Sequence, residues 1–198
     1  MSGIFIVIEG ADGTGKSTHA KLLGEYLRKN GYDVVNTAEP TKGLMGKRTR
    51  EVLSGKADVT PKELTLLFTE DRKEHVKNLV RPSLDGGKVV ICERYFYSTI
   101  AYQSIQGVDP KWIEKINSFA VKPDLVILLK ISPKKALDRM HRQKEVFEVL
   151  EFQEKVQEVL IRFAQTKSWV VVETEADMNR VQDKIRAAVD RFLEKTPK

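Results

Sequence analysis

A glycine-rich stretch near the start of the chain carries the clearest chemical signal. Residues 10–18 read "GADGTGKST" and fit the phosphate-loop pattern G-x-x-x-x-G-K-[ST]. In such a loop the backbone N–H groups close on phosphate oxygens, the lysine reaches the β and γ phosphates, and the serine hydroxyl ligates Mg²⁺. The stretch follows an apolar run at 4–10 and opens a helical pattern at 16–29. We therefore expect a nucleoside triphosphate, with Mg²⁺, to bind Gly10, Ala11, Asp12, Gly13, Thr14, Gly15, Lys16, Ser17 and Thr18.

The variable positions of this loop raise a question about charge. Phosphoryl transfer needs positive charge around the moving group. Residues 11–14 supply none, and Asp12 adds a negative charge instead. The missing charge has to come from another part of the chain, and Asp12 needs a different role.

Two acids stand where apolar runs end. Glu39 is the second-to-last residue of the run at 33–40, and Glu93 is the last residue of the run at 88–93. Ligands of a parallel α/β sheet lie beyond the carboxyl ends of its strands. A carboxylate there can hold Mg²⁺ or accept the proton of an attacking hydroxyl, although acids also end strands simply at solvent. Because Glu93 stands beside Arg94, which can bind phosphate as a fork, we expect Ser17 and Glu93 to be the metal residues.

A second group of side chains has the spacing of a base-reading surface. Phe68 and Arg72 are four apart in a helical pattern, so an aromatic ring and a guanidinium share a face. The ring can stack on a nucleobase, and the guanidinium can hydrogen-bond a carbonyl of the base. The segment 93–103 repeats this spacing with Arg94, Ser98 and Tyr102. The alternative is that Phe68 belongs to the core and Arg72 is a surface charge.

Strand and helix patterns alternate along the chain. The apolar runs predict strands at 4–10, 33–40, 88–93, 124–131 and 168–174. Helical spacing predicts helices at 16–29, 43–54, 61–80, 97–106, 110–120, from 133 onward and at 177–193. Short apolar strands between helices favour an α/β fold, with a five-stranded parallel sheet covered by helices on both faces.

Composition limits the other classes of protein. The 198 residues are 41% hydrophobic and 31% charged, which suits one globular domain. No apolar run is long enough to span a bilayer, and the N-terminal run is interpreted as a strand rather than a signal peptide. The net charge of +6 is spread among acids, without an aromatic-rich basic stripe, so we expect neither a membrane nor a nucleic-acid partner. The single cysteine, Cys92, favours a reducing cytoplasm.

Together these motifs resemble those of the thymidylate kinase family, P-loop nucleoside monophosphate kinases, over nearly the whole chain. The loop is similar to the family's G-x-D/E-G-x-G-K-[ST], and the other matching segments are "TAEP", "LLFTEDR", "ERYFYSTIAYQ" and "KPDLVILLKISP". The resemblance implies a P-loop three-layer fold, phosphorylation of dTMP by ATP, and a homodimer. It also implies an acceptor site made of Asp12, Glu39, Arg50, Phe68, Arg72, Arg94, Ser98, Tyr102 and Gln103.

The resemblance assigns a role to each part of that acceptor site. Asp12 would bond the 3′-hydroxyl of the sugar, and Tyr102 would pack under the sugar. Phe68 would stack on thymine, and Arg72 would bond its carbonyl edge. At the other polar edge of the base would lie Ser98 and Gln103. The acceptor phosphate would be bound by Arg94 with help from Arg50.

The resemblance also supplies the missing positive charge. Family members without a basic residue in the loop use arginines of a lid, and here the lid segment is around 139–148, with Arg139 and Arg142. A solvated basic helix end is the alternative. The catalytic set is then Lys16, Glu93, Arg94, Arg139 and Arg142. The chain departs from the family pattern at Ala38, Glu93, Lys130, Gln157 and Leu160.

Two other functions remain open at this point. A deoxynucleoside kinase would use Glu39 to deprotonate a 5′-hydroxyl. A nucleotide-dependent switch would need only the phosphate loop, but the N-K-x-D guanine motif is missing after the fourth strand, and a switch needs no second nucleotide site.

Overall fold

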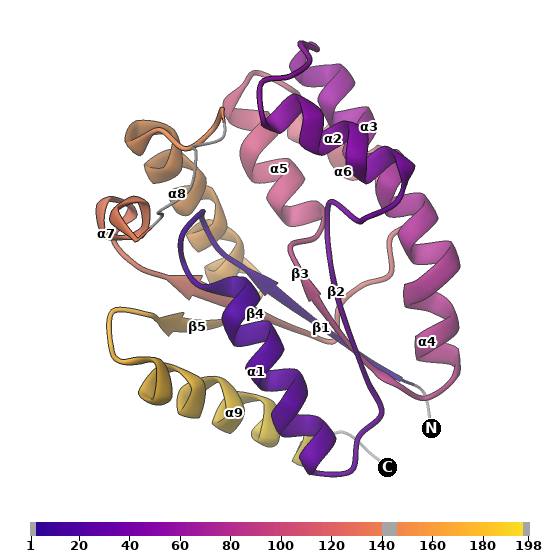
Figure 1. Ribbon diagram of the computed structural model, residues 1–198, viewed down its shortest axis with the longest axis vertical. Coiled ribbons are helices and arrows are strands. Elements are labelled where there is room, and N and C mark those ends of the chain that lie inside the picture. The colour runs from indigo at the N-terminus through magenta and orange to yellow at the C-terminus, as the bar shows by residue number, and fades with distance from the viewer. Residues whose placement is uncertain (1–2, 140–145, 196–198) are drawn as a thin grey trace.

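The computed structural model describes residues 3–139 and 146–195. Its strands are β1 (Ile4–Glu9), β2 (Val34–Ala38), β3 (Val89–Glu93), β4 (Leu125–Lys130) and β5 (Val170–Glu173). They form one five-stranded sheet in the order β2-β3-β1-β4-β5, and every pairing is parallel. The predicted α/β fold with a five-stranded parallel sheet is confirmed, and its central strand is β1, which leads into the phosphate loop (Figure 1).

Helices connect the strands. They are α1 (Lys16–Lys29), α2 (Leu44–Leu53), α3 (Pro61–His75), α4 (Arg81–Asp85), α5 (Phe96–Ile105), α6 (Pro110–Ile116), α7 (Pro133–Asp138), α8 (Leu150–Thr166) and α9 (Met178–Lys195). A π-helical turn, Val76–Val80, joins α3 to α4. None of the helices in the described part of the chain is long and apolar enough to cross a membrane.

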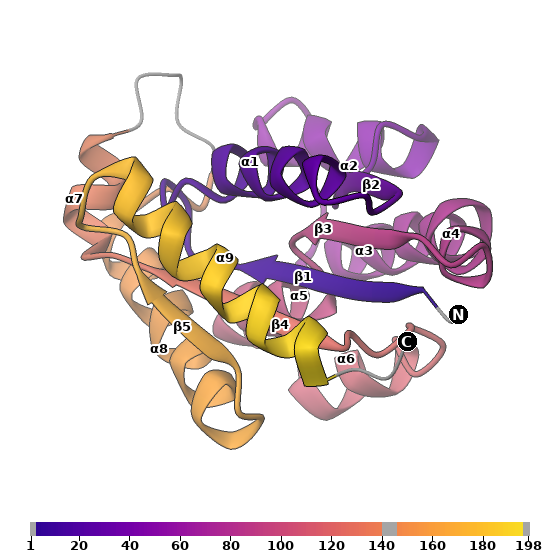
Figure 2. The same ribbon diagram turned by 90° about the horizontal axis from the view of Figure 1, so that it is seen from below.

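Alternation along the strands decides which helices cover which face. Ile6 and Ile8 of β1 pack in one cluster with α1 and α9, whereas Phe5 and Val7 pack in another with the π-helical turn and the start of α5. A third cluster joins Leu128 of β4 to α5 and α8. Figure 2 shows the resulting layers, with α1 above the strands and α8 below them. The three inner strands β1, β3 and β4 are buried on both faces, which is why each reads as an almost unbroken apolar run, whereas the edge strands β2 and β5 are partly exposed.

Local sequence explains where the helices of the site begin. Thr60 and Glu63 form a capping box at the start of α3, and Pro61 occupies the first turn. Asp109 accepts a hydrogen bond from the backbone N–H of Lys111 at the start of α6. The first cap fixes the start of α3, which lines the far end of the pocket described below, and the second fixes the start of α6, which ends beside it at Asn117.

Several predicted boundaries differ from the structure. Each strand is shorter than its apolar run by one to three residues in total. The helix predicted at 110–120 ends at Ile116. The helix predicted at 61–80 divides at His75 into α3 and the π-helical turn. Helix α8 was missed as a helix, although its buried positions Gln153, Val156, Leu160 and Ala164 have helical spacing.

Candidate active site

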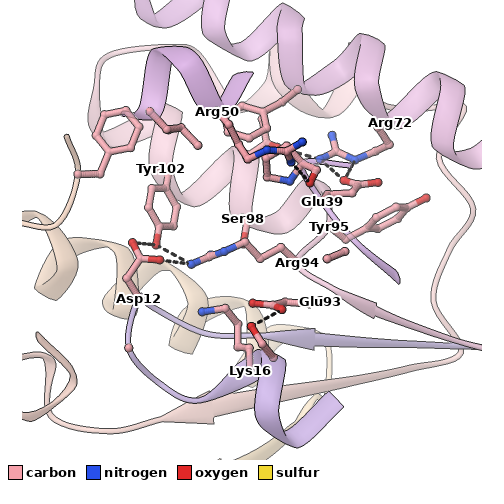
Figure 3. A pocket seen from close by; sticks show the side chains of 18 of the residues that line it. Asp12, Lys16, Glu39, Arg50, Arg72, Glu93, Arg94, Tyr95, Ser98 and Tyr102 are labelled. Atoms are coloured by element: carbon pink, nitrogen blue, oxygen red, sulfur yellow. Dashed lines mark hydrogen bonds and ion pairs between the residues drawn. The ribbon is translucent and has the colours of Figure 1, made fainter. Parts of the chain in front are cut away.

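A pocket of about 900 Å³ lies at the carboxyl edge of the sheet (Figure 3). The phosphate loop forms one end of it, and α2, α3 and α5 form the other. The predicted site residues that line it are Asp12, Gly13, Gly15, Lys16, Ser17, Thr18, Glu39, Arg50, Phe68, Arg72, Glu93, Arg94, Ser98, Tyr102, Gln103 and Arg139. Ala11 and Thr14 are buried inside the loop instead. Arg142 lies outside the described residues.

The phosphate loop has the geometry of its motif. Gly13 has a φ of 76°, and a Cβ there would lie 2.2 Å from the carbonyl oxygen of Ala136, so no other residue fits without moving the chain. The Lys16 ammonium folds back over the loop and donates to the Ala11 carbonyl at 2.7 Å. Burial, together with the nearby positive charge of Arg94, lowers the pKa of Lys16 to about 8. The loop therefore holds its lysine in a dry, electropositive place that an anionic phosphate would stabilise.

Asp12 has a partner that the loop sequence alone does not reveal. Arg94, which follows β3, donates from Nη2 to Oδ1 of Asp12, and the Tyr102 hydroxyl donates to Oδ2 at 2.8 Å. The Gln153 amide makes two hydrogen bonds with Asp12: it donates to Oδ2 at 2.8 Å and accepts from the backbone N–H at 2.9 Å. Burial alone would raise the pKa of the Asp12 carboxyl, but the charges of Arg94 and Lys16 outweigh it and lower that pKa. Asp12 is therefore ionised and brings a cation over the loop (Figure 3).

A buried acid that the sequence analysis missed fixes the position of Arg94. Glu9, the last residue of β1, accepts hydrogen bonds from the backbone N–H of Tyr95 at 2.9 Å and from the hydroxyl of Ser98 at 2.6 Å. Arg94 itself has a φ of 62°, which a non-glycine residue adopts only when its surroundings enforce it. Glu9 ends an apolar strand just as Glu39 and Glu93 do, and that shared pattern was the signal available in the sequence.

The residues predicted to hold Mg²⁺ face each other. The Ser17 hydroxyl donates to Oε2 of Glu93 at 2.7 Å, so the Glu93 side chain reaches the loop. A hydroxyl and a carboxylate are hard oxygen donors, and Mg²⁺ typically takes only one or two protein oxygens besides water and phosphate. The pair fits that ion.

The far end of the pocket is suited to a flat, polar ligand. Phe68 lines it and is half-buried, and Arg72 is only 1% exposed, so Arg72 is not the surface charge of the alternative interpretation. Gln103 is fully buried, and neither its Nε2 nor its Oε1 has a hydrogen-bond partner within residues 3–139 and 146–195. A buried amide without partners costs free energy unless a ligand satisfies it. The pocket thus offers a ring face, a donor and an unsatisfied amide together.

Comparison with known proteins gives this arrangement a family. A model described as thymidylate kinase matches residues 8–185. The chain belongs to the thymidylate kinase family. A probable thymidylate kinase of Thermococcus kodakarensis is 41% identical over 96% of this chain and 98% of its own length. Those of Pyrococcus abyssi and Methanocaldococcus jannaschii are 40% identical, over 98% of both chains, and 44% identical, over 88% of both. By family the chain is a phosphotransferase, a dTMP kinase.

Both carboxylate oxygens of Glu39 are hydrogen-bonded within this kinase, which does not suit a general base. Its Oε2 accepts from Nε of Arg72 at 2.7 Å, and its Oε1 lies 2.9 Å from Nδ1 of His75. Glu39, His75 and Cys92 bring three potential metal ligands within 4.8 Å of one another. Each is engaged, however, because His75 also bonds Thr37 at 2.8 Å and the Cys92 thiol donates to the Arg94 carbonyl at 3.1 Å. Burial raises the pKa of Cys92, so the cluster holds a neutral thiol and does not suit a metal.

The remaining predicted arginines that the structure describes line the pocket from two different elements. Arg50 of α2 donates to the Pro40 carbonyl at 2.8 Å, and Arg139, directly after α7, donates to the Thr174 carbonyl at 3.2 Å. The backbone N–H of Val146 donates to the Leu53 carbonyl of α2 at 3.1 Å. Val146 therefore contacts α2, which no local sequence pattern predicts.

Proposed function

We propose that this thymidylate kinase transfers the γ-phosphoryl group of ATP to the phosphate of dTMP, with Mg²⁺, and that lid arginines complete the donor site. The observation that carries the proposal is a single pocket with two different ends. One end is a phosphate loop, and the other holds Phe68, Arg72 and the unsatisfied amide of Gln103. Arg94 lies between the two ends, where the phosphates of donor and acceptor would meet (Figure 3).

In the proposed reaction the protein positions charge and supplies no strong base. The acceptor phosphate is already anionic near neutral pH, so its oxygen attacks without losing a proton to the protein. Lys16 holds the donor phosphates, and Arg94 binds the acceptor phosphate and compensates the charge that develops between them. Ser17 and Glu93 would hold Mg²⁺, which would supply further positive charge for the donor phosphates.

The sugar of the acceptor is proposed to lie against Asp12 and Tyr102. The Asp12 carboxylate is ionised and can accept a hydrogen bond from the 3′-hydroxyl. The hydrogen bond that Tyr102 donates to Asp12 holds the carboxylate in place. The aromatic ring of Tyr102 occupies the space under the sugar, where a 2′-hydroxyl would clash. Ser98 lies one turn away, and we propose that it stands beside the base; its hydroxyl proton is donated to Glu9.

The lid proposal concerns the positive charge that the loop lacks. Arg139 already lines the pocket at the end of α7. Arg142 is three residues further along the chain, and we propose that both reach the donor phosphates when nucleotide binds. Replacing Arg139 and Arg142 by alanine, singly and together, is expected to lower kcat about 100-fold in the double variant while the KM for dTMP changes little. A double variant with unchanged kcat would remove the lid from the mechanism.

The site also bears on the two competing functions. A nucleoside kinase would need Glu39 as a base for a 5′-hydroxyl, yet both of its oxygens are bonded to Arg72 and His75. A switch would leave the unsatisfied Gln103 amide without a purpose. We therefore favour the monophosphate as acceptor.

A coupled ADP-release assay tests the proposal directly. ATP and Mg²⁺ are supplied with dTMP, dUMP, thymidine or no acceptor. We expect turnover with the monophosphates, fastest with dTMP, and none above background with thymidine. Turnover with thymidine but not with dTMP would establish the nucleoside kinase instead, and slow ADP release independent of acceptor would favour the switch.

Three further expectations belong to the same proposal. We propose one domain over residues 1–198 with a lid around 139–148, a homodimer, and a cytoplasmic enzyme. Sedimentation equilibrium tests the dimer, since a dimer doubles the mass of 22.6 kDa of one chain.

A further inference from the structure

The guanidinium of Arg72 is held from three sides. Its Nε donates to Glu39 at 2.7 Å, its Nη1 donates to Oδ1 of Asn117 at 2.6 Å, and its Nη2 donates to the Thr99 hydroxyl at 3.0 Å. Nη2 also lies 2.7 Å from the same Glu39 oxygen. Among the described residues three of the five N–H groups of the arginine donate hydrogen bonds, Nη2 is also ion-paired with Glu39, and Nη1 keeps one N–H without a partner. An arginine held in this way has little freedom to turn.

The charge of Arg72 is also matched. Glu39 is buried beside it and forms its ion pair, so the site has no net cation to offer. A second anion, such as a phosphate, would be left uncompensated there, whereas a neutral carbonyl oxygen needs only one N–H donor. The arrangement therefore suits the carbonyl of a base at the end of the pocket away from the phosphate loop.

Asn117 has only one orientation that satisfies its neighbours. It ends α6 and is 3% exposed. Its Nδ2 donates to the Ile113 carbonyl at 2.9 Å and to the Thr69 hydroxyl at 3.4 Å, which leaves Oδ1 to face Arg72. A flipped amide would turn its N–H groups against the guanidinium, where every group is a donor. Helix α6 thus acts on the pocket through this one amide.

We propose that Asn117, together with Thr99, is a positioning residue for base selection. The two hold the plane of Arg72 so that the remaining N–H of Nη1 can meet a base carbonyl. Because the guanidinium is held, it cannot rotate to relieve the repulsion between this N–H and an amino group of a base. A pyrimidine with a carbonyl at position 4 is accepted, and one with an amino group there, as in dCMP, is rejected. This inference rests on the proposed function, because it assumes a base at Arg72. Asn117 is not among the described residues that line the pocket, so it acts on the ligand only through Arg72, whereas Thr99 lines the pocket and Thr99→Val also changes its wall.

The test compares dTMP with dCMP in Asn117→Ala and in Thr99→Val. Releasing the guanidinium is expected to raise the KM for dTMP about tenfold, to leave kcat at saturating dTMP within about twofold, and to lower the dTMP:dCMP ratio of kcat/KM about tenfold. Thr99→Ser keeps the hydroxyl and is expected to restore the wild-type ratio. The ratio is the deciding readout, because a variant that is merely less well folded loses activity equally with both substrates.

A matched control is available in β2. The side chain of Asn36 likewise bridges an arginine and a helix carbonyl, accepting from Arg28 at 2.8 Å and donating to Ala20 at 2.8 Å, but it lies away from the pocket. Asn36→Ala is expected to keep the wild-type dTMP:dCMP ratio. An unchanged ratio in Thr99→Val, or in a folded Asn117→Ala, would overturn the inference. A wild-type enzyme inactive with dTMP would instead refute the proposed function itself, so the two failures are distinguishable.

Discussion

The lowered pKa of Lys16 predicts that ATP affinity falls in mildly alkaline solution. Lys16 is 5% exposed, burial disfavours the charged form of its ammonium, and Arg94 adds a like charge, so its pKa is about 8 instead of the ordinary 10.5. Only the protonated lysine binds the β and γ phosphates well, and a bound triphosphate returns the pKa toward its ordinary value. Raising the pH through 8 therefore removes the binding-competent form from the free enzyme.

The size of the effect follows from the titration. With a pKa of about 8, roughly 76% of the free enzyme carries the charge at pH 7.5 and roughly 9% at pH 9, so the apparent dissociation constant rises about eightfold. Raised pKa values keep Tyr95, Tyr102 and Cys92 neutral over that interval. The terminal phosphate of the nucleotide, with a second pKa of about 6, is already ionised.

Isothermal titration calorimetry with ATP at fixed excess Mg²⁺, from pH 7.5 to 9.5, measures this directly. Lys16→Arg keeps its charge throughout and is expected to bind more weakly but without the pH dependence. Lys21→Met, on the exposed face of the same helix, is expected to follow the wild-type profile. A wild-type dissociation constant that stays flat over this interval would refute the electrostatic reasoning.

Three other predictions follow from contacts in the structure. Phe68→Ala is expected to raise the KM for dTMP about 10- to 100-fold with kcat nearly unchanged, since stacking on a base contributes about 1–3 kcal/mol, and steady-state kinetics beside the exposed Glu70→Ala would show it. Arg94→Met is expected to lower kcat/KM at least about 100-fold, because it leaves the partly buried carboxylate of Asp12 without its cation; a loss below about tenfold would contradict the assigned role. Gly46→Ala is expected to lower Tm by several degrees in a thermal melt, although alanine favours helices, because its Cβ would lie 1.9 Å from the Thr41 carbonyl oxygen; Lys47→Ala on the same helix should leave Tm nearly unchanged.

The chain order of strand and helix could be predicted from the sequence because each signal is local. A strand buried on both faces has to be apolar along its length, and the loop after β1 needs glycine where φ is positive. Five strands, the parallel sheet and the residues of the phosphate loop were all available in this way. Helix α8 was not predicted, although the spacing of its buried residues is an ordinary amphipathic helix pattern.

The sequence also placed most of the residues that line the pocket, chiefly through the resemblance of its motifs to a family. Phe68 and Arg72 share a helix face by spacing alone, and Ser17 and Glu93 share a sheet edge by topology. What spacing could not give was the partner of each charge. Asp12 meets Arg94 although 82 residues separate them, and Arg72 meets Asn117 across 45.

Only the tertiary structure decided what those charges do. Glu39 could serve as a base by its position in the sequence, but packing of α3 against the end of β2 places Arg72 and His75 on its two oxygens. Glu9 reads as one more strand residue, yet its burial under α5 makes it the group that holds Arg94. A residue's type and local spacing determine what it can donate or accept. Which group it meets, and how strongly burial acts on its charge, depends on distances between segments that only the folded chain brings together.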